Sequence, residues 1–309
     1  MKTSPAIVCL GEPLIEFNRP KEGDGRTWLQ GFGGDSQNVA IAAARQGASA
    51  GYLTGVGADW MGDAFLELWK SEGVDASRVT RHPSAPTGVS FVTHSESGHK
   101  FDYLRKNSAA SLMTPETLAA DYIAGARFFH LSAIGQAISD SARQTCDAAI
   151  VVARKAGVKV SYDTNLRLRL WELDLARRTI DATIAGCDIA LPSLDDSQQL
   201  TGLSAPDAIV DYYLALGAPL VALKMGAEGS LIATARERFR LPGHRVEAVD
   251  ATGAGDTFDG AFLARLLAGD DLESAGRYAN VAAALSTMGY GAVTPMPRQA
   301  EVLKALSRA

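Results

Sequence analysis

The amino-acid sequence predicts an α/β protein built on a doubly wound, mainly parallel sheet with helices on both faces. Three observations predict this fold class. Short apolar segments end in Gly, Asp or Pro, longer segments with helical periodicity alternate with them, and the composition is that of a folded chain. Of the 309 residues, 47% are hydrophobic and 21% are charged, which excludes a disordered chain.

The predicted strands are short and apolar, as expected for parallel strands that are buried on both faces. They cover residues 7–10, 50–56, 128–131, 158–163, 189–192, 220–224 and 231–234. The predicted helices cover residues 38–46, 64–72, 141–156, 175–185, 208–216, 256–268, 272–288 and 298–307. No internal repeat and no linker divides the sequence, so we expect a single domain over residues 1–309.

Two segments break this alternation, near residues 13–29 and near residues 88–105. The second contains strand-like composition without an adjoining helix, as at Val89 to Thr93. We expect these segments to form a small separate sheet. Such a sheet serves either as a lid over the carboxyl ends of the parallel strands or as a surface hairpin.

Charge and cysteine usage exclude several classes of partner. A net charge of −5 argues against binding to nucleic acid or to an anionic membrane. Cys9, Cys146 and Cys187 are odd in number and far apart, so they form neither a disulfide framework nor a CxxC metal site. The apolar segment at residues 6–10 is too short for a signal peptide or a membrane span. We therefore expect a cytoplasmic protein.

The clearest chemical signal is the sequence DATGAGD at residues 250–256. Aromatic and aliphatic residues then recur every four positions, at Phe258, Phe262 and Leu266, which predicts a helix that begins within this glycine-rich turn. Free N–H groups at such a helix start can hold the charge of a transferred phosphoryl group. A carboxylate at Asp256 would repel that anion, so its position favours a general base. The alternative is that Asp256 only caps the helix.

A second glycine-rich segment, GFGGDSQNVA, occupies residues 31–40 and is followed by LTGVGAD at residues 53–59. Alone it would indicate a turn that caps a helix. Together with residues 250–256, where Ala251 stands at a position that is often Thr, it resembles the two signatures of the ribokinase-like carbohydrate kinases. This family is also called the phosphofructokinase B type, and the resemblance spans essentially the whole chain. It implies the ribokinase-like fold with a small β-sheet lid, and an ATP-dependent kinase.

The resemblance also implies roles for individual residues. The family's catalytic base matches Asp256, and its anion hole matches Gly253, Ala254 and Gly255. Its sugar contacts in the first signature match Gly34, Asp35 and Asn38. Its nucleotide contacts match Asn165, Ser193, Lys224, Gly226, Glu228, Gly229, Gly253, Gly255 and Asn280. ATP and Mg²⁺ are the implied cofactors, with room for a monovalent cation, and relatives commonly form homo-oligomers such as dimers.

One segment, PSLDD at residues 192–196, departs from the family pattern. Many members have a PNxxE motif there that is associated with magnesium and phosphate. In this chain Ser193 replaces the Asn and Asp196 replaces the Glu. The shorter carboxylate of Asp196 can still help to hold a hard cation through water, so we expect it to take part in magnesium binding. The alternative is a solvated helix start.

Two further segments resemble the 2-keto-3-deoxygluconate kinase branch of the family: YLRKNSAA at residues 103–110 and DTNLRLRLW at residues 163–171. The matching substrate contacts are Tyr103, Arg105 and Arg167, and Asp256 would also contact the sugar. A planar guanidinium can grip a carboxylate with two hydrogen bonds, which suits an acidic sugar. Arginines could instead contact ATP phosphates, and Arg167 or Arg169 could form an ion pair on the surface.

The sequence thus predicts transfer of the terminal phosphoryl group of ATP to a hydroxyl of 2-keto-3-deoxygluconate, which gives the 6-phosphate. Ser90 departs from this branch, because related enzymes often have a tyrosine there. The alternatives are a kinase for a neutral ketose such as fructose, a kinase for a nucleoside, and a sugar-binding relative without catalysis.

Overall fold

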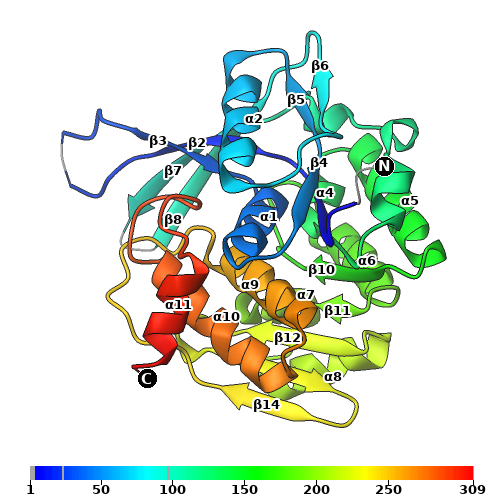
Figure 1. Cartoon of the computed structure of the whole chain (residues 1–309), viewed down its shortest axis with the longest axis vertical. Helices are drawn as coiled ribbons and strands as arrows, with labels where there is room; N and C mark the ends of the chain where they lie inside the picture. The colour runs from blue at the N-terminus through cyan, green and yellow to red at the C-terminus, as the bar shows by residue number, and fades with distance from the viewer. Residues whose placement is uncertain (1–3, 23, 96–97, 309) are drawn as a thin grey trace.

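The computed structural model describes residues 4–22, 24–95 and 98–308 (Figure 1). Its centre is an eight-stranded sheet in the order β14-β13-β12-β11-β10-β9-β1-β4. The strands from β12 to β4 run parallel, and β13 and β14 add antiparallel at one edge. In sheet order the bounds are β14 (Arg238–Leu241), β13 (Ser230–Thr234), β12 (Leu220–Lys224), β11 (Ile189–Ala190), β10 (Lys159–Asp163), β9 (Phe128–Ser132), β1 (Ile7–Leu10) and β4 (Ala50–Leu53).

Both faces of this sheet are buried, because successive strand residues enter two different apolar clusters. On β1, Ile7 and Cys9 join one cluster, and Val8 and Leu10 join the other. The first cluster is covered by α1 (Asp35–Arg45), α2 (Trp60–Glu72), α9 (Ala254–Ala268), α10 (Leu272–Ser286) and α11 (Gln299–Leu306). The second is covered by α3 (Ala120–Ala124), α4 (Ala133–Ala137), α5 (Asp140–Lys155), α6 (Leu173–Ile184), α7 (Leu194–Thr201) and α8 (Pro206–Leu216).

A separate four-stranded sheet, in the order β3-β2-β7-β8, projects from the α/β core on the side of α2 (Figure 1). Its strands are β2 (Leu14–Asn18), β3 (Leu29–Gly33), β7 (Gly88–Ser95) and β8 (Gly98–Leu104). They come from the two segments that break the sequence alternation, of which residues 23, 96 and 97 lie outside the described residues. We call this sheet the small sheet.

Short elements complete the chain. They are the two-stranded pair β5 (Gly55–Gly57) and β6 (Thr80–His82), and the 3-10 turns η1 (Ala110–Leu112), η2 (Pro115–Thr117) and η3 (Gly226–Glu228). Among the described residues, no helix combines the length and the apolar character needed to cross a membrane.

The predicted fold class is confirmed, with differences at particular elements. The single strand predicted at residues 50–56 is wrong: Thr54 separates β4 from β5, which leaves the central sheet to pair with β6. The strand predicted at residues 189–192 shortens to two residues. Residues 238–241 form an unpredicted strand, because their alternating Arg side chains lie at an exposed edge rather than in the core. Helix α1 begins at Asp35, three residues before its predicted start, because Gly34 takes a φ of 106° that ends the preceding strand.

Helix α9 packs closely on α1 because Gly260 has no side chain. A Cβ atom at this position would lie 2.5 Å from the carbonyl oxygen of Val39 and 2.6 Å from the Cβ atom of Ala42. We predict that Gly260→Ala lowers the free energy of unfolding by about 1 to 3 kcal/mol through overpacking, although alanine is the better helix former. Urea denaturation measures this change.

Gly73→Ala is the matched control, since Gly73 has a φ of 72° and open space around it. Its backbone strain should cost about 1 to 2 kcal/mol without moving any helix. Because α1 and α9 carry Asn38 and Asp256, which the sequence predicts to be functional, only Gly260→Ala should also reduce the kinase activity that the sequence predicts. Equal activity losses in the two variants would contradict this account.

Candidate active site

A cavity of about 510 Å³ lies where the carboxyl ends of the parallel strands meet the N-termini of α1 and α9. Open α/β sheets bind their ligands at this edge. Asp163 and Lys224, which end β10 and β12, line the cavity from the sheet. The small sheet closes one side through residues that include Glu16, Ser90 and Tyr103. The cavity therefore joins the central sheet, two helix starts and the small sheet.

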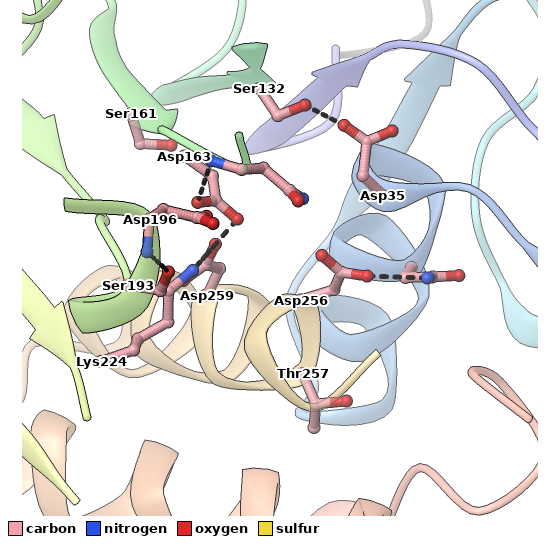
Figure 2. Close-up of polar contacts among 12 residues, drawn as sticks. Asp35, Ser132, Ser161, Asp163, Ser193, Asp196, Lys224, Asp256, Thr257 and Asp259 are labelled. Atoms are coloured by element: carbon pink, nitrogen blue, oxygen red, sulfur yellow. Dashed lines mark hydrogen bonds and ion pairs between the residues drawn. The ribbon is translucent and has the colours of Figure 1, made fainter. Parts of the chain in front are cut away.

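Asp256 lies in the first turn of α9 and lines this cavity. Its side chain faces α1, and the Nδ2 atom of Asn38 donates a hydrogen bond to its Oδ2 atom at 2.8 Å (Figure 2). Burial raises the pKa of Asp256 to about 7, and the nearby charge of Asp35 adds to this effect. A carboxyl with this pKa can accept and release a proton near neutral pH.

The start of α9 is open to an anion. Gly253 precedes the helix with a left-handed φ of 76°, and no side chain caps the first turn. A Cβ atom at Gly253 would lie only 2.9 Å from the Cβ atom of Ala292, so glycine is needed for this approach. Gly253 and Gly255 both line the cavity. The first N–H groups of α9 can therefore hold phosphate oxygens.

A buried ion group joins the sheet to the second turn of α9. The Nζ atom of Lys224 lies 3.0 Å from a carboxylate oxygen of Asp163 and 3.0 Å from one of Asp259 (Figure 2). Burial opposes the charge of Lys224, but the two carboxylates outweigh it and raise the lysine pKa. Burial also raises the pKa of Asp259. Removing one partner from such a group leaves a buried charge unpaired, so the group fixes α9 against β10 and β12.

Two buried carboxylates, those of Asp35 and Glu12, line the cavity from the start of α1 and from the loop after β1. Asp35 accepts a hydrogen bond from Ser132, and its other oxygen has no hydrogen-bond partner among the described residues (Figure 2). Glu12 accepts a hydrogen bond from Ser108 Oγ at 2.7 Å and forms an ion pair with Arg105. Burial raises the pKa of both carboxyls, although Arg105 lowers that of Glu12.

Arg105 and Arg167 are the arginines that line the cavity. The guanidinium of Arg105 lies 4.9 Å from the centre of the Tyr103 ring, and its Nε atom has no hydrogen-bond partner within the described chain. Arg167 donates to the carbonyl oxygen of Leu166 at 2.8 Å. Arg169 instead forms an exposed ion pair with Asp102 on β8 at 3.1 Å. Of the two arginines for which the sequence left a surface ion pair open, Arg169 is the one that forms it.

Most of the site residues that were predicted from the sequence line this cavity. The cavity-lining ones are Gly34, Asp35, Asn38, Tyr103, Arg105, Asn165, Arg167, Ser193, Asp196, Lys224, Gly226, Gly253, Gly255 and Asp256. Four others do not line it. Ala254 opens α9, Glu228 is exposed in η3, and Gly229 follows η3 in close contact with Leu241. Asn280 donates to the carbonyl oxygens of Leu241 and Pro242 at 3.3 and 3.2 Å, so it holds the chain after β14.

Sequence reasoning missed Glu12, Glu16 and Asp259. Glu16 lies beside Ser90 in the register of β2 and β7, and one of its oxygens is buried without a hydrogen-bond partner in the described part of the chain. Burial and the charge of Asp250 raise its pKa to about 7. For two of these residues the sequence does contain a signal that could have found them, which is a carboxylate within an apolar segment. Glu16 interrupts an apolar strand, and Asp259 follows Asp256 by three residues on an apolar helix.

Oxygen atoms suited to magnesium are present near Ser193. Asp195 and Asp196 both line the cavity from the start of α7, and the N–H group of Leu166 donates to Asp196 at 3.0 Å. Burial raises the pKa of Asp196, while Arg167 lowers it. The described residues contain no group of three or more His, Cys, Asp or Glu side chains that could hold a metal by themselves. Hard oxygen ligands of this kind fit a magnesium ion that is shared with phosphate and water.

Comparison with known proteins defines the class. Residues 4–299 match the model of the pfkB family carbohydrate kinases. The 2-dehydro-3-deoxygluconokinase of Thermoproteus tenax is 35% identical over 97% of this chain and 95% of its own length. Fructokinase-1 of Oryza sativa subsp. japonica is 32% identical over 99% of both chains. The fructokinase of Vibrio cholerae O395, solved with fructose, ADP and a calcium ion, has a TM-score of 0.88 and is 28% identical, covering 97% of this chain and 99% of its own.

The chain therefore belongs to the pfkB family of carbohydrate kinases, and it is an ATP-dependent phosphotransferase with an alcohol group as acceptor. The resemblance stated from the sequence is confirmed. 2-Dehydro-3-deoxygluconate is another name for 2-keto-3-deoxygluconate, so the Thermoproteus tenax relative is named as a kinase of that sugar acid. The rice fructokinase is nearly as similar to this chain.

We predict that kcat/KM falls as the pH is lowered through about 7. Asp256 must be ionised to accept a proton, and its pKa is raised to about 7 by burial. The rate should fall close to tenfold per pH unit well below that value. A coupled ADP-release assay from pH 5.5 to 9 at saturating Mg²⁺ measures the profile, and a rate independent of pH across this range would contradict the assignment.

Asp256→Asn should lower kcat by about 10² to 10⁴, because the amide cannot accept the proton. The same variant should melt at a higher temperature than the wild type at pH 8. The folded-state pKa of Asp256 lies above its ordinary value of 3.8, so ionisation destabilises the fold as the pH rises from 3.8 to about 7. Calorimetry at pH 8 and pH 5 checks this sign: the difference in Tm should shrink at pH 5.

Proposed function

We propose that this kinase phosphorylates 2-keto-3-deoxygluconate on its 6-hydroxyl. The observation that carries the proposal is Arg105. Its guanidinium is 9% exposed and lies over the ring of Tyr103, the residue lines the cavity, and its Nε atom has no hydrogen-bond partner among the described residues. A planar donor group in this setting suits a substrate carboxylate. Arg167 supplies a second positive charge at the cavity, from the loop after β10.

The cavity contains several carboxyl groups, so binding of a sugar acid would need both arginines. Glu12 already neutralises Arg105 in part, and Glu16 and Asp35 add buried carboxyls at the sugar end. An anionic sugar must therefore gain enough from the guanidinium groups to outweigh repulsion from these carboxyls. Glu16 and Asp35 each have one oxygen without a hydrogen-bond partner among the described residues, and these oxygens can accept hydrogen bonds from sugar hydroxyls, which orients the neutral part of the substrate.

The transfer step follows from the position of Asp256. Its carboxylate accepts the proton of the sugar hydroxyl, whose oxygen attacks the γ-phosphorus of ATP. A new P–O bond forms to the sugar, and the bond between the γ-phosphorus and the bridging oxygen breaks, so that its electron pair leaves with ADP. Asn38 orients the Asp256 carboxylate, and the N–H groups at the start of α9 stabilise the charge on the phosphoryl oxygens. Asp256 then returns the proton to solvent.

Magnesium belongs to this proposal as the partner of ATP. Asp195 and Asp196 would hold it through water, and its charge offsets that of the phosphate oxygens. We further propose that the small sheet acts as a lid within one kinase domain and that the enzyme works in the cytoplasm. Exposed apolar side chains on or beside the small sheet, Trp28, Leu29 and Leu104, support a homo-oligomer such as a dimer.

The second candidate is a kinase for a neutral ketose such as fructose. It is favoured by the ion pair between Arg105 and Glu12, which leaves less positive charge for a substrate carboxylate. Ser90, in place of a larger side chain, also widens the space beside Glu16. A nucleoside kinase and a sugar-binding relative without catalysis are the remaining alternatives.

A substrate panel separates these candidates. Purified enzyme with ATP and Mg²⁺ is offered 2-keto-3-deoxygluconate, gluconate, fructose, ribose and adenosine, and the phosphorylated position is read by ³¹P–¹H NMR. The proposal expects the highest kcat/KM for 2-keto-3-deoxygluconate with phosphate on its 6-oxygen. Efficient phosphorylation of fructose with no turnover of the acidic sugar would establish the second candidate.

We predict that Arg167→Ala lowers kcat/KM for 2-keto-3-deoxygluconate by about 30-fold or more, because truncation removes one of the two positive charges proposed to hold the substrate carboxylate. Arg105→Ala should lose at least as much, since it also leaves buried Glu12 unpaired. Arg105→Lys should recover only part of the loss, because lysine lacks the planar fork.

Arg169→Ala is the matched control, because Arg169 is exposed and does not line the cavity. It should change kcat/KM by less than about threefold, as expected for a surface ion pair. The KM for ATP separates the two roles of the arginines. A rise in that KM as large as the loss for the sugar would assign the arginines to the nucleotide.

A further inference from the structure

The small sheet is hydrogen bonded directly to the loop that precedes α9, through Asn18. This residue ends β2 and is 2% exposed. Its Nδ2 atom donates to Asp250 Oδ2 at 2.9 Å, across 232 positions of the chain. Its Oδ1 atom lies 2.8 Å from Nε2 of His94, on the neighbouring strand β7. Asn18 is thus held by its own sheet and faces Asp250.

Asp250 uses the same carboxylate to hold two loops together. Its Oδ1 atom accepts from the N–H and the hydroxyl of Thr252, at 2.9 and 2.7 Å. Its Oδ2 atom, which receives the Asn18 bond, also accepts from the N–H of Gly291 at 3.0 Å. The first pair forms the turn that leads into Gly253, and the last bond fixes the loop against which Gly253 packs through Ala292. The shape of the open start of α9 therefore depends on where this carboxylate lies.

We propose that Asn18 is a positioning residue for phosphoryl transfer. It fixes the Asp250 carboxylate and thereby holds the anion-binding turn at residues 250–253 in a fixed position relative to the small sheet. This inference rests on the proposed role of that turn in holding the transferred phosphoryl group. It does not depend on which sugar is the substrate.

The fold of the small sheet does not itself require this side chain. Backbone pairing places Asn18 opposite Leu29 on β3 and Val92 on β7, and any residue could supply those backbone groups. The amide is instead suited to its contacts, because it donates to a carboxylate on one side and pairs with an imidazole on the other. An aspartate here would set two buried carboxylates side by side and repel Asp250.

The hydrogen bond between Asn18 and Asp250 therefore links the part of the cavity proposed for the sugar to the part proposed for the phosphoryl group. Residues Glu16 and Ser90 of the small sheet line the end of the cavity proposed for the sugar, and residues 251–253 of the turn line the end proposed for the phosphoryl group. An error of about 1 Å in their relative position can cost about 10²-fold in rate. Deleting the Asn18 amide should therefore reduce turnover more than it weakens binding of either substrate.

The test compares Asn18→Ala and Asn18→Asp with Gln30→Ala, which removes an exposed amide from β3 of the same sheet. Circular dichroism and Tm first establish how much of each protein is folded. For Asn18→Ala we expect kcat per folded molecule to fall by about 10-fold to 100-fold, with the KM for ATP changed less than threefold. Asn18→Asp should lose more at pH 8, and Gln30→Ala should match the wild type.

Hydrogen–deuterium exchange on the same proteins gives a readout that needs no substrate. Amide exchange at Thr252 and Gly291 should rise in both Asn18 variants and stay unchanged in Gln30→Ala. A lower Tm with unchanged kcat per folded molecule, or unchanged exchange at these amides, would overturn the inference. If Asn18→Ala does not fold, Asn18→Asp decides by the same criteria. A wild-type protein that phosphorylates no sugar refutes the proposed function instead, and the exchange result then decides on Asn18 alone.

Discussion

The close packing of α1 on α9 is the contact on which the rest of the site depends. Gly260 lets the two helices approach, and their N-termini then meet at the carboxyl ends of the parallel strands. This contact brings Asn38 on α1 within 2.8 Å of Asp256 on α9. It also buries Asp256, and burial is the main cause of its raised pKa. One steric requirement, the absence of a side chain at Gly260, therefore sets both the geometry and the proton affinity of the candidate base.

The site is unusually rich in buried carboxyl groups, and their burial conflicts with stability. Asp35, Asp256 and Asp259 all have raised pKa values because they are removed from water. Lys224 offsets part of this charge between Asp163 and Asp259, and Arg105 offsets that of Glu12. The fold thus retains charges that a purely structural core would avoid. Such an arrangement is typical of a site in which protons and anionic groups must be handled.

The sequence was sufficient for the fold class and for most of the cavity, for identifiable reasons. Short apolar strand segments and apolar helical stripes are local signals, and the glycine-rich turns at residues 31–34 and 253–255 mark helix starts directly. The roles of Glu12 and Asp259 were not predictable in this way, although the position of Asp259 on an apolar helix is itself unusual for a carboxylate. Each becomes significant only through a partner far along the chain, Arg105 in one case and Lys224 in the other. The resemblance to the family implied that Asn280 contacts the nucleotide, but this residue lies outside the cavity and donates a hydrogen bond to the end of β14.

The central claim is that Asp256 and the start of α9 act on a hydroxyl of a sugar whose carboxylate is held by arginine. A crystal structure of the enzyme with 2-keto-3-deoxygluconate and a non-hydrolysable ATP analogue tests it most directly. The account predicts the 6-hydroxyl of the sugar within hydrogen-bond distance of Asp256, the γ-phosphate at the N–H groups that follow Gly253, and the sugar carboxylate on Arg105 or Arg167. A sugar hydroxyl remote from Asp256, or a carboxylate that contacts neither arginine, would contradict it.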